Sequence, residues 1–320
     1  MHEDVIGQKI QSILRVSNKV FKFQSRCLEK SSNLFGQVPV TMRQPTILLI
    51  AVVALFCTGS IKPAFRTMSL FNGKDLTGWD VYIGSAYDTI SKKFAGEPLG
   101  LNNDLLKVFS VVNVDGKPAL RVSGERFGGI STTREYKNYH LRLEFKWGKL
   151  KWHPKRNDKR DSGLLYHAVG NHGADGGFWM RSQEFQIQEG DCGDYWGVAG
   201  GIADVPAVKA GDKKFVYTPG SPLLAFSEKG PNGRNCTKNP DAEKPTGQWN
   251  VIDLYCFGDT SIHVVNDQVT MILFNSRQAE GDRELPLTNG KIQLQSEGAE
   301  LFYRNLVLEE IKSLPKKLFN

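Results

Sequence analysis

Apolar and polar residues alternate in short runs along most of the chain after residue 68, and the runs end at Gly, Asn, Asp or Pro. A period of two is typical of strands with one buried and one polar face. Ten runs are also rich in β-branched or aromatic residues, so we predict strands there. They cover residues 109–114, 119–123, 139–147, 163–167, 182–188, 250–257, 260–265, 270–274, 291–295 and 301–309.

Turn signals separate these strands, and no helical periodicity of useful length interrupts them. Residues 113–118 (NVDGKP) contain an Asp-Gly pair, and 266–268 also favour a hairpin turn. Many short strands without alternating helices predict an all-β fold, a two-sheet jelly-roll sandwich. Because no internal repeat or Gly/Ser linker divides it, we expect a single domain over residues 61–320.

The first 60 residues have a different character. Met42 begins a segment with a basic residue, an apolar run over 47–57 and small residues at 58–60. This is the layout of a secretory signal peptide, and its apolar run is short for a membrane span. We therefore predict a signal peptide at 42–60, with 1–41 as an over-extended start or a disordered extension. The mature protein is expected to be exported to the periplasm or cell surface, with Cys57 as a candidate site of lipid attachment.

The formal net charge is +7, and much of the excess lies in residues 149–160 and in the last eight residues. These runs lack a helix pattern, a nucleic-acid motif and regularly interleaved aromatic residues. We therefore exclude nucleic acid as a partner and interpret 149–160 as a solvated loop between two strands.

Three cysteines belong to the expected mature chain. Cys192 and Cys236 lie in Gly- and Asn-rich segments and could form a disulfide in an exported protein. Cys256 lies in a predicted strand, where it is expected to pack as a small hydrophobe. No Cys-x-x-Cys or His-x-His spacing indicates zinc.

The predicted strand at 182–188 places Glu184 and Gln186 on one face, in a segment rich in polar and aromatic residues. Such a face is either an ordinary solvent-exposed surface or the wall of a cleft for a ligand rich in hydroxyls. Glu144 lies on the polar face of the strand at 139–147. If the two strands are near neighbours, Glu144 and Glu184 form the carboxylate pair that glycosidic chemistry commonly uses. The alternative for Glu144 is a surface ion pair.

Several other residues are candidates for the same cleft. His167 could transfer protons or be structural, and Tyr166 beside it should point to the opposite face. Sugar rings could stack on tryptophans, although core packing explains them equally well; the candidates are Trp179, Trp196 and Trp249. Asp191 and Asp194 could hold a hard cation such as calcium, or could simply form turns.

A set of motifs in fixed order resembles the 3-keto-disaccharide hydrolase family over residues 69–311. They are SLFNGKDLTGWDVY at 69–82, STTREYKNYHLRLEFKW at 131–147, DSGLLYH at 161–167, Glu-x-Gln at 184–186, GQWN at 247–250 and LQSEGAELFYRNL at 294–306. The chain has Glu297 where many relatives have a histidine, which indicates a subgroup with different chemistry or another substrate.

The resemblance implies a concanavalin A-like sandwich and an exported enzyme that cleaves 3-keto-glycosides. A C3 ketone acidifies the C2 hydrogen, so cleavage by elimination needs a base, an enolate stabiliser and an acid for the leaving group. No Gly-rich dinucleotide loop is present, so a separate oxidoreductase would supply the keto sugar.

The resemblance also suggests roles for individual residues. We expect Glu184 to be the base or a cation ligand, and Gln186 to bind hydroxyls or the keto oxygen. Glu144 and His167 compete for the second proton-transfer role, while Tyr166 and Trp196 are assigned to the sugar platform. A divalent cation near Glu184 could stabilise the enolate. A non-catalytic lectin-like module and a direct two-carboxylate glycosidase are the alternatives.

Overall fold

Each of the ten predicted strands is present in the computed structural model, which describes residues 67–319. The additional strands carry weak sequence signals because most are only two to five residues long. One of them, β8 (Gly128–Thr132), is buried along its whole length and therefore shows no alternation. The only helical element within residues 67–319 is the 3-10 turn η1 (Lys316–Phe319).

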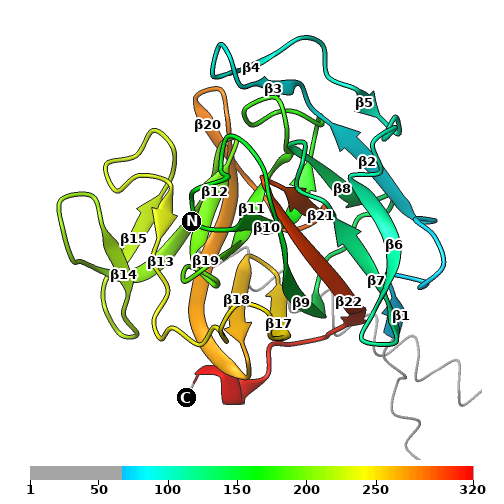
Figure 1. Ribbon diagram of the computed structural model, residues 1–320. Helices are drawn as coiled ribbons and strands as arrows, with labels where there is room; N and C mark the ends of the chain where they lie inside the picture. The colour runs from blue at the N-terminus through cyan, green and yellow to red at the C-terminus, as the bar shows by residue number, and fades with distance from the viewer. Residues whose placement is uncertain (1–66, 320) are drawn as a thin grey trace, which may run out of the picture. The chain divides into compact units, whose positions relative to one another are not determined.

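The larger sheet contains twelve strands (Figure 1). Its order is β14 (Phe215–Tyr217), β13 (Gly201–Lys209), β19 (Gln268–Glu280), β18 (Thr260–Val265), β17 (Asn250–Phe257), β9 (Tyr139–Lys151), β22 (Ala299–Glu310), β7 (Lys117–Val122), β6 (Phe109–Val114). Three further strands pair at its margins: β1 (Thr67–Ser69) with β22, β15 (Leu223–Phe226) with β13 and β20 (Arg283–Pro286) with β19.

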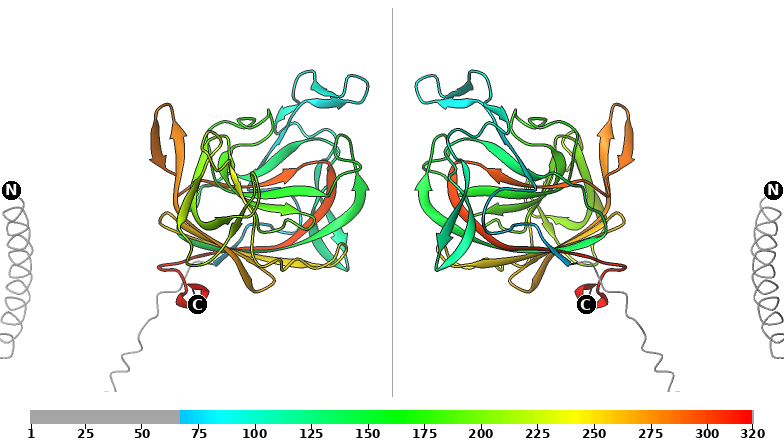
Figure 2. Two further views of the ribbon diagram at one scale, coloured as in Figure 1. Left: turned by 90° about the vertical axis from the view of Figure 1, so that its left-hand side faces the viewer. Right: turned by 90° about the vertical axis from the view of Figure 1, so that its right-hand side faces the viewer.

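The smaller sheet contains eight strands and carries the residues of the candidate site. Its order is β16 (Asn235–Cys236), β12 (Tyr195–Val198), β11 (Arg181–Gln188), β10 (Asp161–Val169), β21 (Lys291–Ser296), β8, β2 (Trp79–Ile83), β5 (Gly100–Leu101). A separate hairpin joins β3 (Ala86–Asp88) to β4 (Lys93–Ala95). This hairpin and the β19–β20 hairpin extend beyond the sandwich in both views of Figure 2.

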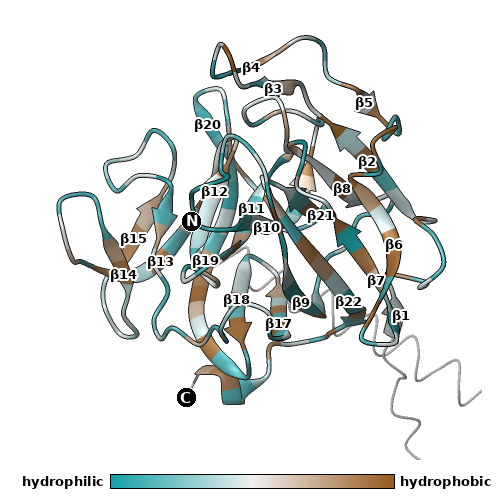
Figure 3. Cartoon of the chain, viewed as in Figure 1, coloured by the Kyte–Doolittle hydropathy of each residue, from teal (hydrophilic) through white to brown (hydrophobic). Residues whose placement is uncertain are grey.

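The main core lies between the two sheets. Leu164, Phe185 and Leu294 of the smaller sheet belong to the same buried cluster as Leu141 and Leu301 of the larger one. Hydrophobic and hydrophilic residues are mixed along the strands, whereas the loops are mostly hydrophilic (Figure 3). Burial of the apolar faces of two antiparallel sheets is the arrangement of a jelly-roll sandwich, which confirms the predicted fold class.

Both predicted hairpin turns are present. The β6–β7 turn has positive φ at Asp115 and Gly116 (51° and 75°), and the β18–β19 turn has positive φ at Asn266 and Asp267 (48° and 67°). Two successive residues with positive φ match the twist of the flanking strands. Asn, Asp and Gly tolerate this conformation best, so sequence composition alone locates these turns.

The sequence left open whether Cys192 and Cys236 form a disulfide, and the structure shows that they do not. Both residues are buried free thiols, as is Cys256, which packs in the core as expected. Cys236 is paired as a strand residue with Tyr195, so the Gly-rich segment around it is not an open loop.

The predicted extension at 1–41 and signal peptide at 42–60, including Cys57, lie outside the described residues. Among residues 67–319 no helix is long and apolar enough to cross a membrane.

Candidate active site

The candidate site lies on the face of the smaller sheet that is turned away from the core. In β11, Phe185 and Ile187 point into the core, so Glu184 and Gln186 point to the opposite face. The antiparallel register places Gly163 of β10 opposite Gln186. The alternation predicted from the sequence therefore presents two polar side chains to this face.

A cavity of about 230 Å³ opens on this face. Its acidic and basic side chains are Asp161, Asp175, Glu184, Glu297, Lys155 and Arg234. Its other residues are Trp179, Gln186, Gln188, Trp196, Val198 and Gln295. Four residues that the sequence singled out thus line one pocket: Glu184, Gln186, Trp179 and Trp196. Three carboxyl groups without an assigned role lie beside them, those of Asp161, Asp175 and Glu297.

Gly163 allows two polar side chains to meet above β10. A methyl group at this position would collide with Oε1 of Glu184 and lie 2.5 Å from Oε1 of Gln295. Only glycine leaves room for both oxygens, so the missing side chain at residue 163 helps to shape the pocket.

The pKa of Glu184 is raised well above its ordinary value by burial, and the carboxyl groups of Glu297 and Asp161 raise it further. The residue is only 6% exposed. A carboxyl group in this environment holds its proton more strongly than an ordinary glutamate does. Glu184 is therefore suited to donate a proton to an oxygen atom of a ligand.

The ammonium group of Lys155 forms ion pairs with both Asp161 and Glu297. Burial and the nearby Asp161 raise the pKa of Glu297 from 4.5 to about 8, although Lys155 acts in the opposite direction. Burial also raises the pKa of Asp161. Despite its own burial, Lys155 has a raised pKa because Glu297 and Asp161 favour its charged form.

Arg234 and two tryptophans form another part of the wall. The guanidinium group of Arg234 lies 5.3 Å from the ring centroid of Trp196 and 3.3 Å from Oδ1 of Asp175. Trp179 donates a hydrogen bond from its indole nitrogen to the Gly128 carbonyl (3.0 Å). Both indoles are fixed by these contacts and line the pocket, so they can present flat surfaces to a sugar ring.

Two buried acceptor atoms at the pocket have no hydrogen-bond partner in the described part of the chain. They are Oδ1 of Asp161 and Oε1 of Gln295. Buried polar atoms are rarely left unpaired because desolvation costs about 1–3 kcal/mol. Both residues line the pocket, and these two oxygens keep unused capacity to accept hydrogen bonds.

The expected approach of Glu144 to Glu184 is wrong. Glu144 lies on β9, which pairs with β17 and β22 of the larger sheet and not with β10 or β11. Its carboxylate accepts hydrogen bonds from Arg304 Nε and Asn305 Nδ2, both at 2.6 Å. The ion-pair interpretation of Glu144 is therefore correct, with Arg304 of the neighbouring strand β22 as the partner.

Tyr166 and His167 also lie outside the pocket, contrary to expectation. The Tyr166 hydroxyl contacts Ser261 Oγ (2.8 Å) and His263 Nε2 (3.2 Å) across the core. His167 is 1% exposed, and its ring lies edge-on to Tyr139 of the larger sheet. The register of β10 shifts here and His167 has φ of +53°, so both side chains face the core. Burial lowers the pKa of His167 to about 4, which favours a neutral structural histidine.

The carboxylates considered for calcium already have lysine partners. Asp191 pairs with Lys159 at 2.5 Å, and Asp194 accepts a hydrogen bond from the backbone of Lys238, whose Nζ lies 3.7 Å away. Burial raises the pKa of Asp194 to about 6. Residues 67–319 contain no group of three or more His, Cys, Asp or Glu side chains that could hold a metal ion. The donors at Asp191 and Asp194 therefore do not fit a calcium site.

Trp249, the third candidate sugar platform, is part of a network on the larger sheet. The guanidinium group of Arg304 lies 3.7 Å from its ring centroid, and its indole nitrogen donates to Asp115 Oδ2 (2.9 Å). Its neighbours are thus residues of the larger sheet, so Trp249 has a structural role.

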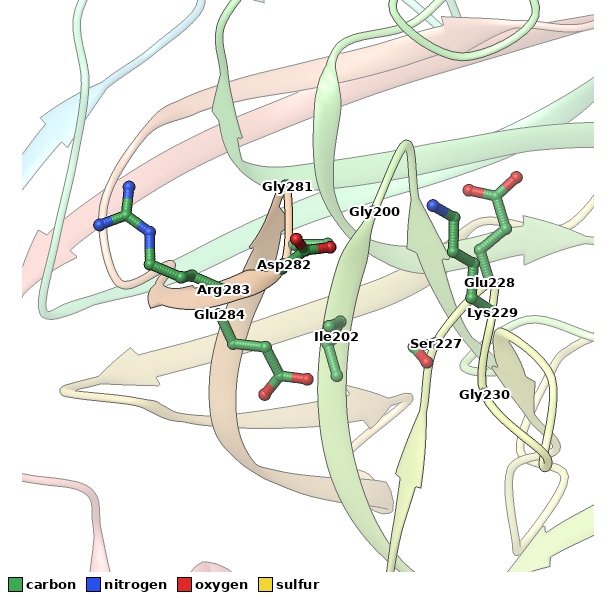
Figure 4. Close-up of a pocket in the computed structure, with 11 residues that line it drawn as sticks. Gly200, Ile202, Ser227, Glu228, Lys229, Gly230, Gly281, Asp282, Arg283 and Glu284 are labelled. Carbon is green, nitrogen blue, oxygen red and sulfur yellow. The ribbon is translucent and has the colours of Figure 1, made fainter.

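A second cavity, of about 260 Å³, lies between the β19–β20 hairpin and the loop after β15 (Figure 4). Ile202 of β13 forms its floor, while Arg283 points away from it in the close-up. Its charged side chains, including Glu228, Lys229 and Asp282, come from exposed loop tips. Buried carboxyl groups with raised pKa values distinguish the pocket at Glu184, which we therefore take as the candidate active site.

The sequence contained a signal for some of the unassigned pocket residues. Extending the strand alternation from Gly163 back to Asp161, and from Leu294 to Gln295, places both polar residues on the site face. Lys155 gave no such signal, because it lies in a basic run that we interpreted as a solvated loop. Arg234 and Asp175 also come from segments without a strand pattern.

The chain is similar in sequence to one family and more distantly similar to several solved structures. A sequence model described as a 3-keto-alpha-glucoside-1,2-lyase-like domain matches residues 66–309. A search of curated proteins found no match. A candidate glycosyl hydrolase from Parabacteroides distasonis is 16% identical, with TM-score 0.41 over 77% of this chain and 94% of that chain. The Bacillus licheniformis beta-glucanase is 11% identical, with TM-score 0.38 over 78% and 98%.

Proposed function

The chain belongs to the 3-keto-alpha-glucoside-1,2-lyase-like domain family, and we propose that it cleaves the glycosidic bond of 3-keto-glycosides in the pocket at Glu184. The observation that carries this proposal is the pair of buried carboxyl groups, Glu184 and Glu297, whose pKa values are raised in one cavity. Perturbed carboxyl groups that line a pocket are typical of proton-transfer sites.

The reaction begins with removal of the proton from C2 of the keto sugar. The electrons of the C2–H bond form a C2–C3 double bond, and the C3 oxygen becomes an enolate. When the ketone is restored, a C1–C2 double bond forms and the C1–O bond breaks. The leaving oxygen takes a proton from an acid, and water can later add to the unsaturated product.

We assign Glu297 as the base and Glu184 as the acid, which reverses the role first expected for Glu184. A carboxylate whose pKa is about 8 is a far stronger base than an ordinary glutamate, and a C–H proton requires this. Glu184, whose pKa is raised by burial and by the carboxyl group of Glu297, can protonate the leaving oxygen.

The remaining pocket residues would bind the sugar. The unpaired oxygens of Asp161 and Gln295 would accept hydrogen bonds from its hydroxyls, and Gln186 would contribute a polar side chain beside them. Trp196 and Trp179 would contact its ring. The cavity is smaller than the roughly 300–1,000 Å³ of pockets for drug-sized ligands, so we expect it to hold one sugar ring.

The two alternative functions make different demands on this pocket. A direct glycosidase built on Glu144 and Glu184 is excluded, because the two residues belong to different sheets. A lectin-like module would bind sugar through aromatic and amide groups, without any need for buried acids of raised pKa. The cost of burying the carboxyl groups of Glu184 and Glu297 therefore favours catalysis.

The test compares a glucoside with its 3-keto analogue. We expect cleavage of the keto sugar alone and its loss in Glu184→Gln. Cleavage of both sugars would support direct glycoside hydrolysis, and binding without cleavage would support a lectin. Either of those outcomes contradicts the proposed function.

We also propose that the protein is exported through the segment at 42–60. The support is its sequence alone: an apolar run between a basic residue and small residues. Mass spectrometry of the N-terminal peptide from native cells should find a terminus near residue 60, or a lipid on Cys57. A native protein that retains residues 1–41 would contradict this.

A further inference from the structure

Lys155 is held at the pocket by both ends of its loop. At one end, the Trp152 backbone donates a hydrogen bond to the Gly298 carbonyl (2.8 Å) and its indole to the Ser123 carbonyl (3.0 Å). At the other end, the Arg160 backbone donates to the Glu189 carboxylate (2.9 Å). Lys155 is therefore not a mobile surface lysine, and its side chain has a fixed position against the site.

The loop passes close to Gly298, which brings the Lys155 stem beside the residue after Glu297. A methyl group at Gly298 would lie 3.0 Å from Cβ of Lys155, and φ there is +84°. This packing directs the ammonium group to the Glu297 carboxylate. The side chain of Lys155 remains 26% exposed, whereas the carboxylates of Glu297 and Asp161 are 12% and 3% exposed.

Two carboxylates that face one another across a small gap are the usual arrangement around a divalent cation. In this pocket the ammonium group of Lys155 already lies between them and binds both. An ammonium group has three N–H donors, and Asp161 and Glu297 use two of them. The third is left for an oxygen atom of a ligand in the pocket.

We propose that the ammonium group of Lys155 serves in place of a divalent cation and donates its third hydrogen bond to the enolate oxygen of the bound keto sugar. This inference rests on the proposed cleavage of 3-keto-glycosides. The C3 oxygen gains negative charge as Glu297 removes the C2 proton, and the fixed positive charge stabilises it. When C1–O breaks, the ketone forms again and Lys155 keeps all of its protons.

The inference accounts for the chemistry of Glu297 as well. A histidine at residue 297 would not form an ion pair with Lys155 when neutral, whereas a glutamate attracts the ammonium group into the pocket. Lys155 and Glu297 are thus best understood as one unit, in which the lysine supplies the positive charge and the glutamate supplies the base.

The test compares Lys155→Ala, Lys155→Arg and Lys159→Ala in the full chain, each with a melting temperature. Lys159 is the matched control, because it lies in the same loop but pairs with Asp191. We expect Lys155→Ala to lower kcat on a 3-keto-glucoside by roughly 100- to 1,000-fold. Added methylammonium should restore part of this activity, and Lys159→Ala should match the unmodified protein.

Metal independence is tested separately. A chelator should leave the activity of the unmodified protein unchanged. Calorimetric titration with Ca²⁺, Mg²⁺ or Mn²⁺ should give the same heat for the unmodified protein and for Glu297→Gln, because no cation binds at Glu297. Three results would overturn the inference: loss of activity with the chelator, a heat of cation binding that is absent in Glu297→Gln, or near-normal activity of folded Lys155→Ala. The titration needs no substrate, so it shows whether a cation binds even if the unmodified protein fails to cleave the keto sugar. That failure would refute the proposed function and not the inference about Lys155.

Discussion

Glu184 and Glu144 show how strongly the surroundings of a residue determine what it can do. Glu184 is buried among other acids and its pKa is raised well above the ordinary value. Glu144 is engaged by Arg304 and Asn305 on the other sheet. Both are glutamates on the polar face of a predicted strand, so the alternation pattern alone could not separate them.

Glu184→Gln should lower kcat on a 3-keto-glucoside by roughly 100- to 10,000-fold, because the amide cannot protonate the leaving oxygen. The melting temperature should be unchanged or higher, since a neutral amide replaces a group that is costly to ionise. Glu144→Gln is the matched control and should leave kcat unaltered. Equal activity in both variants would remove Glu184 from the mechanism.

The activity should depend on pH through Glu297. As pH rises from 6 towards 8, more of the Glu297 carboxyl loses its proton, because its pKa is about 8. The kcat/KM measured across this range should therefore increase with pH. Glu297→Gln should abolish this rise along with most of the activity. A flat profile in the unmodified protein would contradict the assignment of Glu297 as base.

Strand β10 illustrates what a single element contributes to both core and site. Gly163 leaves space for Glu184 and Gln295, and the irregular segment at Tyr166 and His167 turns both rings into the core. A regular strand would have sent His167 to the site face. The local shift in register is what made the prediction for this residue wrong.

Gly163→Ala should displace the Glu184 carboxylate, because the added methyl group collides with its Oε1. A displacement of about 1 Å can cost on the order of 100-fold in rate, so we expect a loss of that size in kcat. Gly211→Ala is the control, since its methyl group would meet only Lys214 Cβ at 3.5 Å. Unchanged kcat in Gly163→Ala would show that the pocket tolerates the methyl group.

The sequence predicts where the strands of this fold lie along the chain, but not which strands pair with one another in the sheets. All ten predicted strands are present, because each is a short run rich in β-branched or aromatic residues and bounded by turn residues. Pairing partners cannot be obtained this way: β9 (ending at Lys151) lies between β17 and β22, which begin only at Asn250 and Ala299. For the same reason Glu184 was identifiable as part of a polar face, whereas its association with Lys155 and Glu297 was not.

For the whole molecule, the buried ionisable groups determine how stability depends on pH. The folded-state pKa of Glu297 is raised from 4.5 to about 8, so its ionisation opposes folding above that range. As pH falls from about 8.5 to 6.5, the folded protein gains the proton and the free energy of unfolding rises. The slope for one such group is at most about 1.4 kcal/mol per pH unit.

Below pH 6.5 the buried histidines act in the opposite direction. Burial lowers the pKa of His167 to about 4 and that of His263 to about 3, so the unfolded chain binds protons at these residues first, which offsets part of the stability that the carboxyl groups contribute as pH falls. Urea unfolding between pH 6.5 and 8.5 should therefore show stability that falls as pH rises, with a shallower slope in Glu297→Gln. Stability that increases steadily up to pH 8.5 would contradict these burial effects.

The most direct test of the account is the fate of the C2 hydrogen. Turnover of a 3-keto-glucoside deuterated at C2 can be followed by NMR beside the undeuterated sugar. Proton removal at C2 predicts that the deuterium is lost to solvent water during cleavage, and that Glu184→Gln cleaves neither sugar. Cleavage that leaves the deuterium on C2 would contradict the central claim.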